Sequence, residues 1–283
     1  MNEPHTFTPY EFREYVSYSE FTAWQICPAK HEHAYILNTE PMHRPAALPF
    51  GSAIHGALAA QYECLRKGNQ LQPKGAFLDD FRARWGKEQD EPGPILFDKD
   101  TTTDSYTDLG ITMLSDFYDE AKMPTKVIAV EYGFTAPLVD PATQGVLPKK
   151  LKGYIDLIAR YGDNEDAAAI VEHKTASKAF DDDRLRFDPQ LAAYQMAVRA
   201  DLQIKEPRLA YQVILKNAKP PKKKKDDEPW QRVRWYEVAR SEAQEREFVA
   251  QLVAMMRTVG AGVVWKNRGW QCKDCAYRYK CEV

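Results

Sequence analysis

The sequence lacks several features that would place it in a broad class of protein. No apolar run approaches the roughly 20 residues that a membrane-spanning helix requires. Residues 1–14 contain no apolar stretch of the kind found in a secretory signal. There is also no internal repeat and no Gly-x-x-x-x-Gly-Lys-Ser/Thr loop for a nucleotide. We therefore expect a cytoplasmic protein with no membrane partner and no nucleotide-driven motor of its own.

An excess of charge of either sign is also missing. The 39 lysines and arginines and the 41 aspartates and glutamates give a formal net charge of -2. This balance argues against a protein that coats nucleic acid through charge alone, although a sum over the chain does not exclude a local basic surface. Hydrophobic residues make up 44% and charged residues 28%, which is the composition of an ordinary globular protein.

The chain changes near residue 125 from helical to strand-like periodicity. The earlier part predicts helices at residues 20–27, 50–66, 75–85 and 107–121, with a loop at 87–105. The later part predicts strands at 126–138, 151–160, 167–174, 208–215 and 232–238, and helices at 188–200 and 241–259. This order indicates an α/β (α+β) fold. Within one domain of residues 1–283, we expect a helical N-terminal part at 15–125, a sheet core at 126–240, and a C-terminal helix and cysteine-containing lobe at 241–283.

One predicted hairpin brings charged residues together. Two apolar runs flank the turn-rich residues 161–166, and reflection across a turn centred near Asn164 places Asp156 opposite Glu172. Facing carboxylates with Cβ atoms about 5 Å apart repel each other unless a divalent cation lies between them. Lys174 shares their face, where an ammonium can orient a water nucleophile or stabilise developing negative charge. The alternative is a solvated hairpin, since Glu-x-Lys alone is common.

Two residues beside this hairpin are further candidates. The side chain of His173 is directed to the other face of the strand, but its backbone carbonyl can still reach a metal ion. Glu131, on the preceding strand, is another acidic candidate for the same site. Its alternative explanation is a solvated glutamate on an edge strand.

Four short motifs, taken in order, carry a family resemblance. Gly153-Tyr-Ile-Asp156 and Glu172-His-Lys174 resemble the Gly-x-x-Asp and Glu-x-Lys motifs of the RecB-like branch of the PD-(D/E)XK nucleases. Gln190-Leu-Ala-Ala-Tyr194 resembles that branch's Gln-x-x-x-Tyr helix motif, and Gly51-Ser-Ala-Ile-His55 resembles its early Gly-x-x-x-His motif. The resemblance implies a restriction-endonuclease-like core with a mixed central sheet flanked by helices.

The resemblance also implies a role for each matching residue. His55, Asp156 and Glu172 would ligate Mg²⁺ or Mn²⁺, helped by the backbone carbonyl of His173. Asp156, Glu172 and Lys174 would be the catalytic residues. Without the other motifs, His55 is more simply explained as a buried helix histidine that hydrogen-bonds a neighbour.

A second group of residues is predicted to contact DNA. The resemblance implies that Gln190 and Tyr194 line the site and contact DNA, and their spacing of four residues places them on one helix face. Lys152 precedes the hairpin, and Arg184 and Arg186 precede the Gln190 helix. These three cations are candidates for contact with the phosphate backbone.

The five cysteines are an odd number, which in a reducing compartment disfavours a disulfide framework and favours metal binding. Cys272-x2-Cys275-x5-Cys281 is one ligand short of four, and Cys27 is the natural fourth. This set resembles the iron–sulfur staple of RecB-like nucleases, including AddB-type subunits and CRISPR-adaptation nucleases, which implies a [4Fe–4S] cluster. A structural Cys₄ Zn²⁺ site and reduced thiols are the alternatives. Cys64 is expected to be a helix-packing thiol.

From the resemblance we expect a Mg²⁺- or Mn²⁺-dependent deoxyribonuclease that hydrolyses phosphodiester bonds. It implies an exonuclease rather than an endonuclease, acting in recombination or repair, with a phage or mobile-element system as one setting. DNA is the expected partner, together with a helicase or recombination protein that would supply any unwinding. Two alternatives stay open: a nuclease-fold subunit that grips DNA without cutting it, and a zinc-stabilised enzyme of another class.

Overall fold

The computed structural model describes residues 13–162, 168–217 and 231–281, so the predicted turn centre at Asn164 lies outside the described residues. Within these residues, six strands form a mixed central sheet in the order β1-β5-β6-β7-β8, and β4 pairs with β5. Pairing is parallel for β1 with β5 and for β6 with β7, and antiparallel for the remaining pairs. The strands are β1 Tyr15–Val16, β4 Lys126–Ala136, β5 Lys150–Arg160, β6 Ala168–Ala176, β7 Arg208–Leu215 and β8 Val233–Val238.

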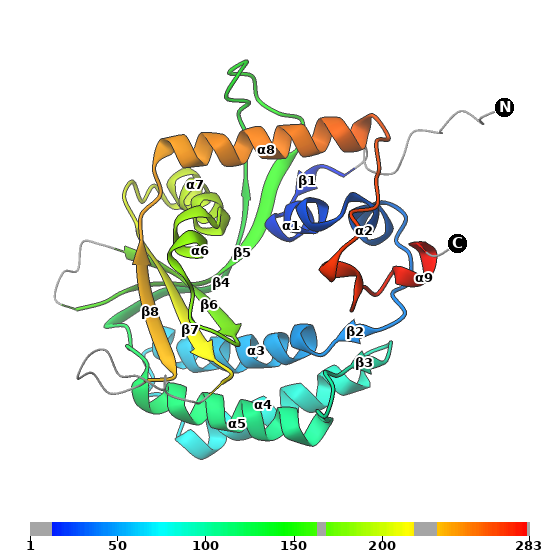
Figure 1. Cartoon of the computed structure of the whole chain (residues 1–283). Coiled ribbons are helices and arrows are strands. Elements are labelled where there is room, and N and C mark those ends of the chain that lie inside the picture. The colour runs from blue at the N-terminus through cyan, green and yellow to red at the C-terminus, as the bar shows by residue number, and fades with distance from the viewer. Residues whose placement is uncertain (1–12, 163–167, 218–230, 282–283) are drawn as a thin grey trace.

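Helices flank this sheet on both faces (Figure 1). Helices α3, α4 and α5 lie together against one face, and α7 and α8 cover the other, with α1 packed against α8. The long helices are α1 Tyr18–Ile26, α3 Ala47–Arg66, α4 Lys74–Asp90, α5 Thr103–Glu120, α7 Gln190–Leu202 and α8 Glu242–Gly260. The shorter elements are α2 Pro28–His31, a π-helix at Glu32–Ile36, β2 Arg44–Pro45, β3 Ile95–Leu96, α6 Asp182–Phe187, a 3₁₀-helix at Trp270–Cys272 and α9 Arg278–Cys281.

Burial identifies β6 and β7 as the central strands. Both contain long runs of consecutive buried residues, as expected for strands that are covered on both faces. Within β6, Ile170 packs in the core formed with α7 and α8, whereas Val171 packs in the core formed with α3, α4 and α5. Since neighbouring side chains point to opposite faces, this alternation also fixes the directions of the residues that follow.

The largest departures from the predicted elements occur where the apolar pattern is weak. The predicted loop at 87–105 is shorter, because α4 continues to Asp90 and a capping box at Thr102 starts α5. The helix predicted to begin at residue 188 begins at Gln190, whose backbone N–H donates to the Asp188 side chain. Helix α6 was not predicted, because none of its residues is buried and it has no periodic apolar stripe.

Two helix glycines provide a test of how closely α4 and α5 pack. A Cβ atom at Gly110 of α5 would lie 2.1 Å from Cζ of Phe81 on α4, whereas a Cβ atom at Gly86 of α4 would meet nothing within 4 Å. Gly110→Ala is therefore expected to lower the free energy of unfolding by about 1–3 kcal/mol through overpacking. Gly86→Ala should raise it by up to about 1 kcal/mol. Urea unfolding of both variants measures this, and equal effects would contradict the described packing.

Candidate active site

The strands β5 and β6 pair only near the turn that joins them. Their pairs run from Arg160↔Ala168 to Leu157↔Val171, which is the register predicted from the turn. Continuing that register by one residue sets Asp156 opposite Glu172. There the two strands separate, because β5 next pairs with β1 at Leu151 while β6 continues along β7.

The carboxylate of Asp156 accepts a hydrogen bond from the backbone of β6 at the point where the two strands separate. Its Oδ2 accepts a hydrogen bond of 2.8 Å from the backbone N–H of His173. The side-chain alternation of β5 also slips here, because Ile155 and Leu157 pack in different cores although residues two apart share a face in a regular strand. The partner strand is irregular at the same place: Glu131 has a φ of 48°, and the β4–β5 ladder skips the Glu131–Asp156 pair. Left-handed backbone at a non-glycine residue is strained and is often found at functional sites.

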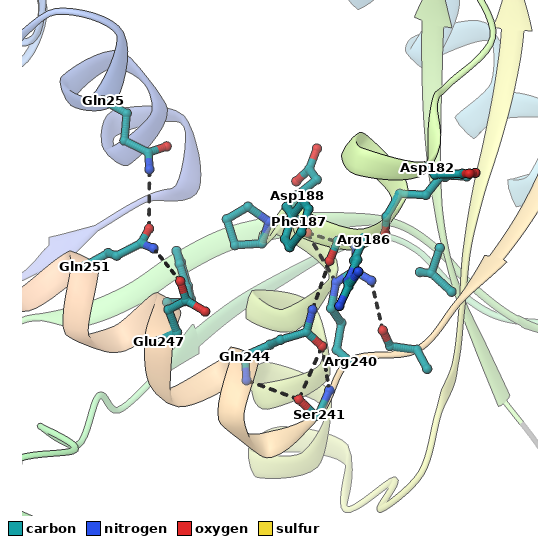
Figure 2. Close-up of a pocket in the computed structure, with 15 residues that line it drawn as sticks. Gln25, Asp182, Arg186, Phe187, Asp188, Arg240, Ser241, Gln244, Glu247 and Gln251 are labelled. Carbon is teal, nitrogen blue, oxygen red and sulfur yellow. Dashed lines mark hydrogen bonds between the residues drawn. The ribbon is translucent and has the colours of Figure 1, made fainter.

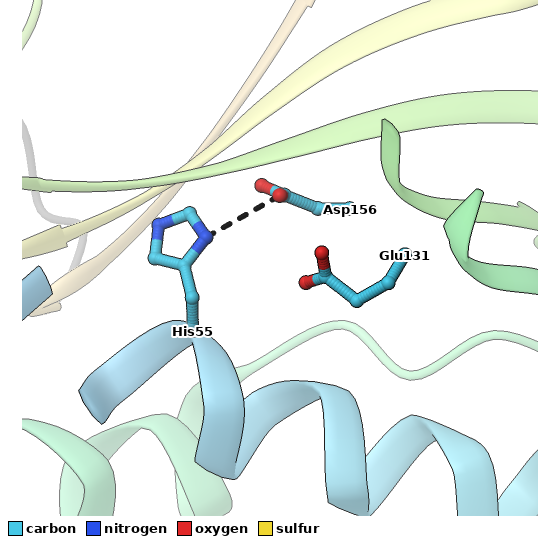
Figure 3. Close-up of side chains that lie close together, drawn as sticks. All are labelled: His55, Glu131 and Asp156. Carbon is cyan, nitrogen blue, oxygen red and sulfur yellow. Dashed lines mark hydrogen bonds and ion pairs between the residues drawn. The ribbon is translucent and has the colours of Figure 1, made fainter. Parts of the chain in front are cut away.

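These irregularities bring two carboxylates to one histidine of α3 (Figure 3). His55 Nδ1 lies 3.3 Å from Asp156 Oδ1. Ligand atoms of His55, Glu131 and Asp156 all lie within 4.8 Å of one another. Two carboxylates and an imidazole are donors that Mg²⁺ and Mn²⁺ accept. The sequence had placed Glu131 below the other acidic candidates, whereas the structure groups it with His55 and Asp156.

The other predicted catalytic residues lie together on the α7 side of β6. Glu172 Oε1 is 2.6 Å from Lys174 Nζ and accepts a hydrogen bond of 2.7 Å from Gln190 Nε2. Gln190 Nε2 also lies 2.8 Å from the Tyr194 hydroxyl. Glu172 Oε2 is buried without a hydrogen-bond partner in the described residues. A buried carboxylate oxygen without a donor is costly, so this atom suits a bound cation.

The two carboxyl groups predicted to be catalytic have opposite pKa shifts. Burial and the Asp156 charge raise the pKa of Glu172 to about 7, although Lys174 opposes this. Burial also acts to raise the pKa of Asp156, but the hydrogen bond and charge of His55 outweigh it and lower that pKa to about 2. For Lys174, burial acts to lower the pKa, but the Glu172 charge outweighs it and the pKa is raised. The site therefore favours an ionised Asp156 and a charged Lys174.

A match to a known protein family spans all of the site residues described above. A model of the PD-(D/E)XK nuclease superfamily matches residues 15–282. The chain belongs to this superfamily. The fold of this nuclease is also similar to the crystal structure of a "Putative exonuclease" from Eubacterium rectale, with a TM-score of 0.56 and 16% sequence identity over 98% of this chain and 92% of that chain. At this identity the likeness establishes a shared fold. No curated protein matches the chain.

The described part of the nuclease contains no helix with the length and apolar character needed to cross a membrane.

The residues predicted to contact the DNA backbone lie at two places in the nuclease. Lys152 is on β5, with its Nζ 4.8 Å from the centre of the Tyr15 ring. Arg184 and Arg186 are on α6, where their guanidinium groups lie 3.7 Å and 5.2 Å from the ring centres of Phe180 and Phe187. The structure therefore separates Lys152 from the two arginines.

A cavity of about 840 Å³ lies between α1, α6 and the start of α8, and Arg186 lines it (Figure 2). One side is bounded by a chain of hydrogen bonds from Gln25 to Gln251 and from Gln251 to Glu247. Neither the His55 group nor Lys174 is among its described lining residues. This cavity is thus not built from the residues predicted to be catalytic.

The four predicted cysteine ligands line a single cavity of about 440 Å³, although Cys27 follows α1 and the other three follow α8. The sulfur of Cys27 accepts a hydrogen bond of 3.4 Å from the backbone N–H of Asn267. Basic side chains also line this cavity, namely Lys30, Lys266, Arg268, Lys273 and Arg278. Soft sulfur donors with nearby positive charge fit Zn²⁺ or an iron–sulfur cluster. Cys64 lies on α3 and is not among the described lining residues.

One contact beside the site has no signal in the sequence. The hydroxyl of Tyr18 on α1 donates a hydrogen bond of 2.9 Å to Asp188 Oδ1, and the same oxygen caps the backbone N–H of Gln190. Asp188 thereby joins α1 to the start of α7. Tyr18 and Asp188 are 170 positions apart, and a lone tyrosine gives no indication of such a partner.

The ring of His173 provides a test of burial on the far face of β6. It stacks on Tyr62 with ring centres 5.3 Å apart, and burial lowers its pKa to about 4. The unfolded chain binds a proton near pH 6.5 and the folded chain does not, so stability from this group is lost as pH falls from 6.5 to 4. The loss should be about 3 kcal/mol.

His173→Phe keeps a ring against Tyr62 and cannot be protonated. We expect its unfolding free energy at pH 7 to lie within about 1.5 kcal/mol of wild type, and its loss between pH 6.5 and pH 4 to be smaller. Urea unfolding at several pH values measures both quantities. An unchanged pH slope would show that His173 is not the group responsible.

Proposed function

We propose that this nuclease belongs to the RecB-like branch and is a Mg²⁺- or Mn²⁺-dependent deoxyribonuclease. One observation carries the proposal: ligand atoms of His55, Glu131 and Asp156 meet within 4.8 Å, beside a Glu172–Lys174 pair at 2.6 Å. A sheet has no structural reason to gather these charges. The unpartnered Oε2 of Glu172 offers a further oxygen ligand, and the backbone carbonyl of His173 would complete the predicted set.

Each residue has a separate task in hydrolysis. When bound, Mg²⁺ or Mn²⁺ would polarise the phosphodiester and lower the pKa of a bound water. Lys174 lies where its ammonium can orient the attacking water and stabilise the negative charge that develops on the phosphoryl oxygens. The water oxygen bonds to phosphorus and gives up a proton to solvent, the bond from phosphorus to the leaving oxygen breaks, and that oxygen takes up a proton from solvent. Gln190 holds the Glu172 carboxylate in place through the 2.7 Å hydrogen bond.

The DNA strand would pass Gln190 and Tyr194, with Lys152, Arg184 and Arg186 as contacts to its phosphates. We favour exonuclease action on DNA ends, in recombination or repair, and in the cytoplasm. The description of the Eubacterium rectale protein as an exonuclease supports this form. Since the sequence has no nucleotide-binding loop of the Gly-x-x-x-x-Gly-Lys-Ser/Thr type, unwinding would come from a helicase or recombination protein.

We also propose that Cys27, Cys272, Cys275 and Cys281 hold a [4Fe–4S] cluster. Their lining of one cavity supports this. In the described residues, no three of these sulfurs meet the 4.8 Å mutual spacing that the His55 group meets. Four thiolates around Zn²⁺, with Zn–S bonds of about 2.3 Å, would lie only about 4 Å apart. Binding of an inorganic group by the four sulfurs would tie Cys27 to the segment after α8.

Removal of the Lys174 ammonium tests the catalytic assignment. Lys174→Ala should slow cleavage of DNA by about 10²–10⁴-fold, because it removes a group that acts in the transition state. The dissociation constant for DNA should change little. The assay uses 5′- and 3′-labelled single and double strands with Mg²⁺ and with Mn²⁺.

Lys87→Ala is the matched control, because Lys87 is an exposed lysine on α4, and it should cut as wild type does. Cleavage by Lys174→Ala at the wild-type rate would remove Lys174 from the mechanism. Wild-type protein that binds DNA but cuts nothing with either metal would instead support a non-cleaving DNA-binding subunit.

Loss of one cysteine tests the cluster. Cys281→Ser should reduce iron and sulfide content and lower the free energy of unfolding by about 4 kcal/mol, since the link closes a very long loop. Cys64→Ser should retain wild-type iron content. Anaerobically purified wild-type protein should be brown with broad visible absorbance. Colourless protein with one equivalent of zinc would reject the iron–sulfur cluster in favour of a Zn²⁺ site.

A further inference from the structure

One edge of β5 is left without a neighbouring strand beside the catalytic cluster. On that edge β1 pairs with residues 150–151 and β6 with residues 157–160, while β4 follows the other edge. In the described part of the sheet, no strand therefore pairs with residues 152–156 on the side of β6. Backbone groups at an open sheet edge are free to bind a ligand.

A cavity of about 390 Å³ lies at this open edge, between β5 and the starts of α1 and α7. Its volume is in the lower part of the range of about 300–1,000 Å³ for small-ligand sites. The described lining residues are Tyr15, Ser17, Tyr18, Ser19, Phe134, Leu151, Lys152, Gly153, Tyr154, Gln190, Ala193 and Tyr194.

The lining is aromatic and basic, in contrast to the acidic cluster next to it. Tyr15, Phe134 and Tyr154 contribute rings, and no described lining residue is an aspartate or glutamate. Lys152 lies over the Tyr15 ring, and no carboxylate of the described residues forms an ion pair with it. The 840 Å³ cavity differs in this respect, because Asp182, Asp188 and Glu247 line it. The charge of the smaller cavity therefore suits an anionic, aromatic ligand.

Two glycines, which have no side chain, leave space for the rings of Phe134 and Tyr154. A Cβ atom at Gly153 would lie 2.8 Å from Cζ of Phe134, and one at Gly133 would lie 3.1 Å from the Tyr154 ring. The ring of Tyr154 therefore lies close over β4, and its residue remains 59% exposed. Exposed aromatic rings, together with a cation that can contact phosphate, are features of surfaces that bind single-stranded nucleic acid.

The cavity adjoins the proposed catalytic cluster at Gln190 and Tyr194. Both residues line the cavity, and Gln190 Nε2 contacts Glu172 Oε1. The other amide atom, Gln190 Oε1, is buried and has no hydrogen-bond partner in the described residues. A ligand in the cavity would thus be separated from Glu172 by the side chain of Gln190.

We propose that this cavity is a subsite for one unpaired nucleotide of the strand that is cut, with its base against Tyr154 and Tyr15 and its phosphate near Lys152. The proposal rests on the proposed nuclease function and names its substrate class. A base inside a blunt duplex is stacked on its neighbours, so it cannot at the same time stack on these rings. The nuclease would therefore prefer single strands and frayed ends over blunt duplex.

Binding measurements on uncut DNA test the subsite. All proteins carry Lys174→Ala, which prevents cleavage, and the ligands are a single-stranded oligonucleotide with 2-aminopurine near its end and a blunt duplex of the same sequence. Tyr154→Ser should weaken single-strand binding about tenfold and remove the 2-aminopurine quenching, because it deletes a stacking platform. Duplex binding should be unchanged. Tyr154→Phe, which keeps the ring, should bind as the parent does.

Leu37→Ser is the matched control, because Leu37 is similarly exposed, at 55%, and is not among the described lining residues of this cavity. Equal single-strand binding by Tyr154→Ser and its parent would overturn the subsite, as would an equal loss in Leu37→Ser. The nuclease proposal fails separately: wild-type protein that never cuts DNA would reject it, whereas a loss of single-strand binding confined to Tyr154→Ser would still support the subsite.

Discussion

The site depends on one hydrogen bond at the point where two strands separate. The backbone N–H of His173 donates to Asp156 Oδ2 just beyond the last β5–β6 pair. A carboxylate oxygen thereby replaces a strand carbonyl, so the sheet opens without leaving that N–H unpaired. Because side chains alternate along β6, Glu172 and Lys174 then share the opposite face from the His173 ring. This bond therefore anchors Asp156 to the strand that carries Glu172, His173 and Lys174.

Opening the sheet also concentrates negative charge, which the fold tolerates in two ways. Burial raises the pKa of Glu172, whereas His55 lowers the pKa of Asp156 despite its burial. The site consequently holds less negative charge at neutral pH than its carboxyl groups would carry in water. Backbone strain at Glu131, which has a φ of 48°, brings a further oxygen to the same histidine. Strain and repulsion of this kind are retained where binding can offset them.

Much of this arrangement could be predicted because its signals are local. β5 and β6 are joined by a short turn, so reflection gave their register, and a spacing of four residues set Gln190 and Tyr194 on one helix face. The left-handed backbone of Glu131 could not be predicted from the sequence. The position holds a glutamate and not the glycine that usually marks this conformation. The open edge of β5 was also hidden, because β1 is only two residues long. Such features depend on distant segments and leave no periodic pattern.

The cysteine-lined cavity has a consequence for biosynthesis. One wall comes from Cys27 and the other from residues after α8, which are synthesised only after all strands of the sheet. A nascent chain can build the sheet and its acidic cluster before this cavity exists, because the last strand ends at Val238. Closure of the cavity therefore follows synthesis of the sheet, and a chain interrupted before Cys272 would carry the predicted catalytic side chains without the junction between α1 and the segment after α8.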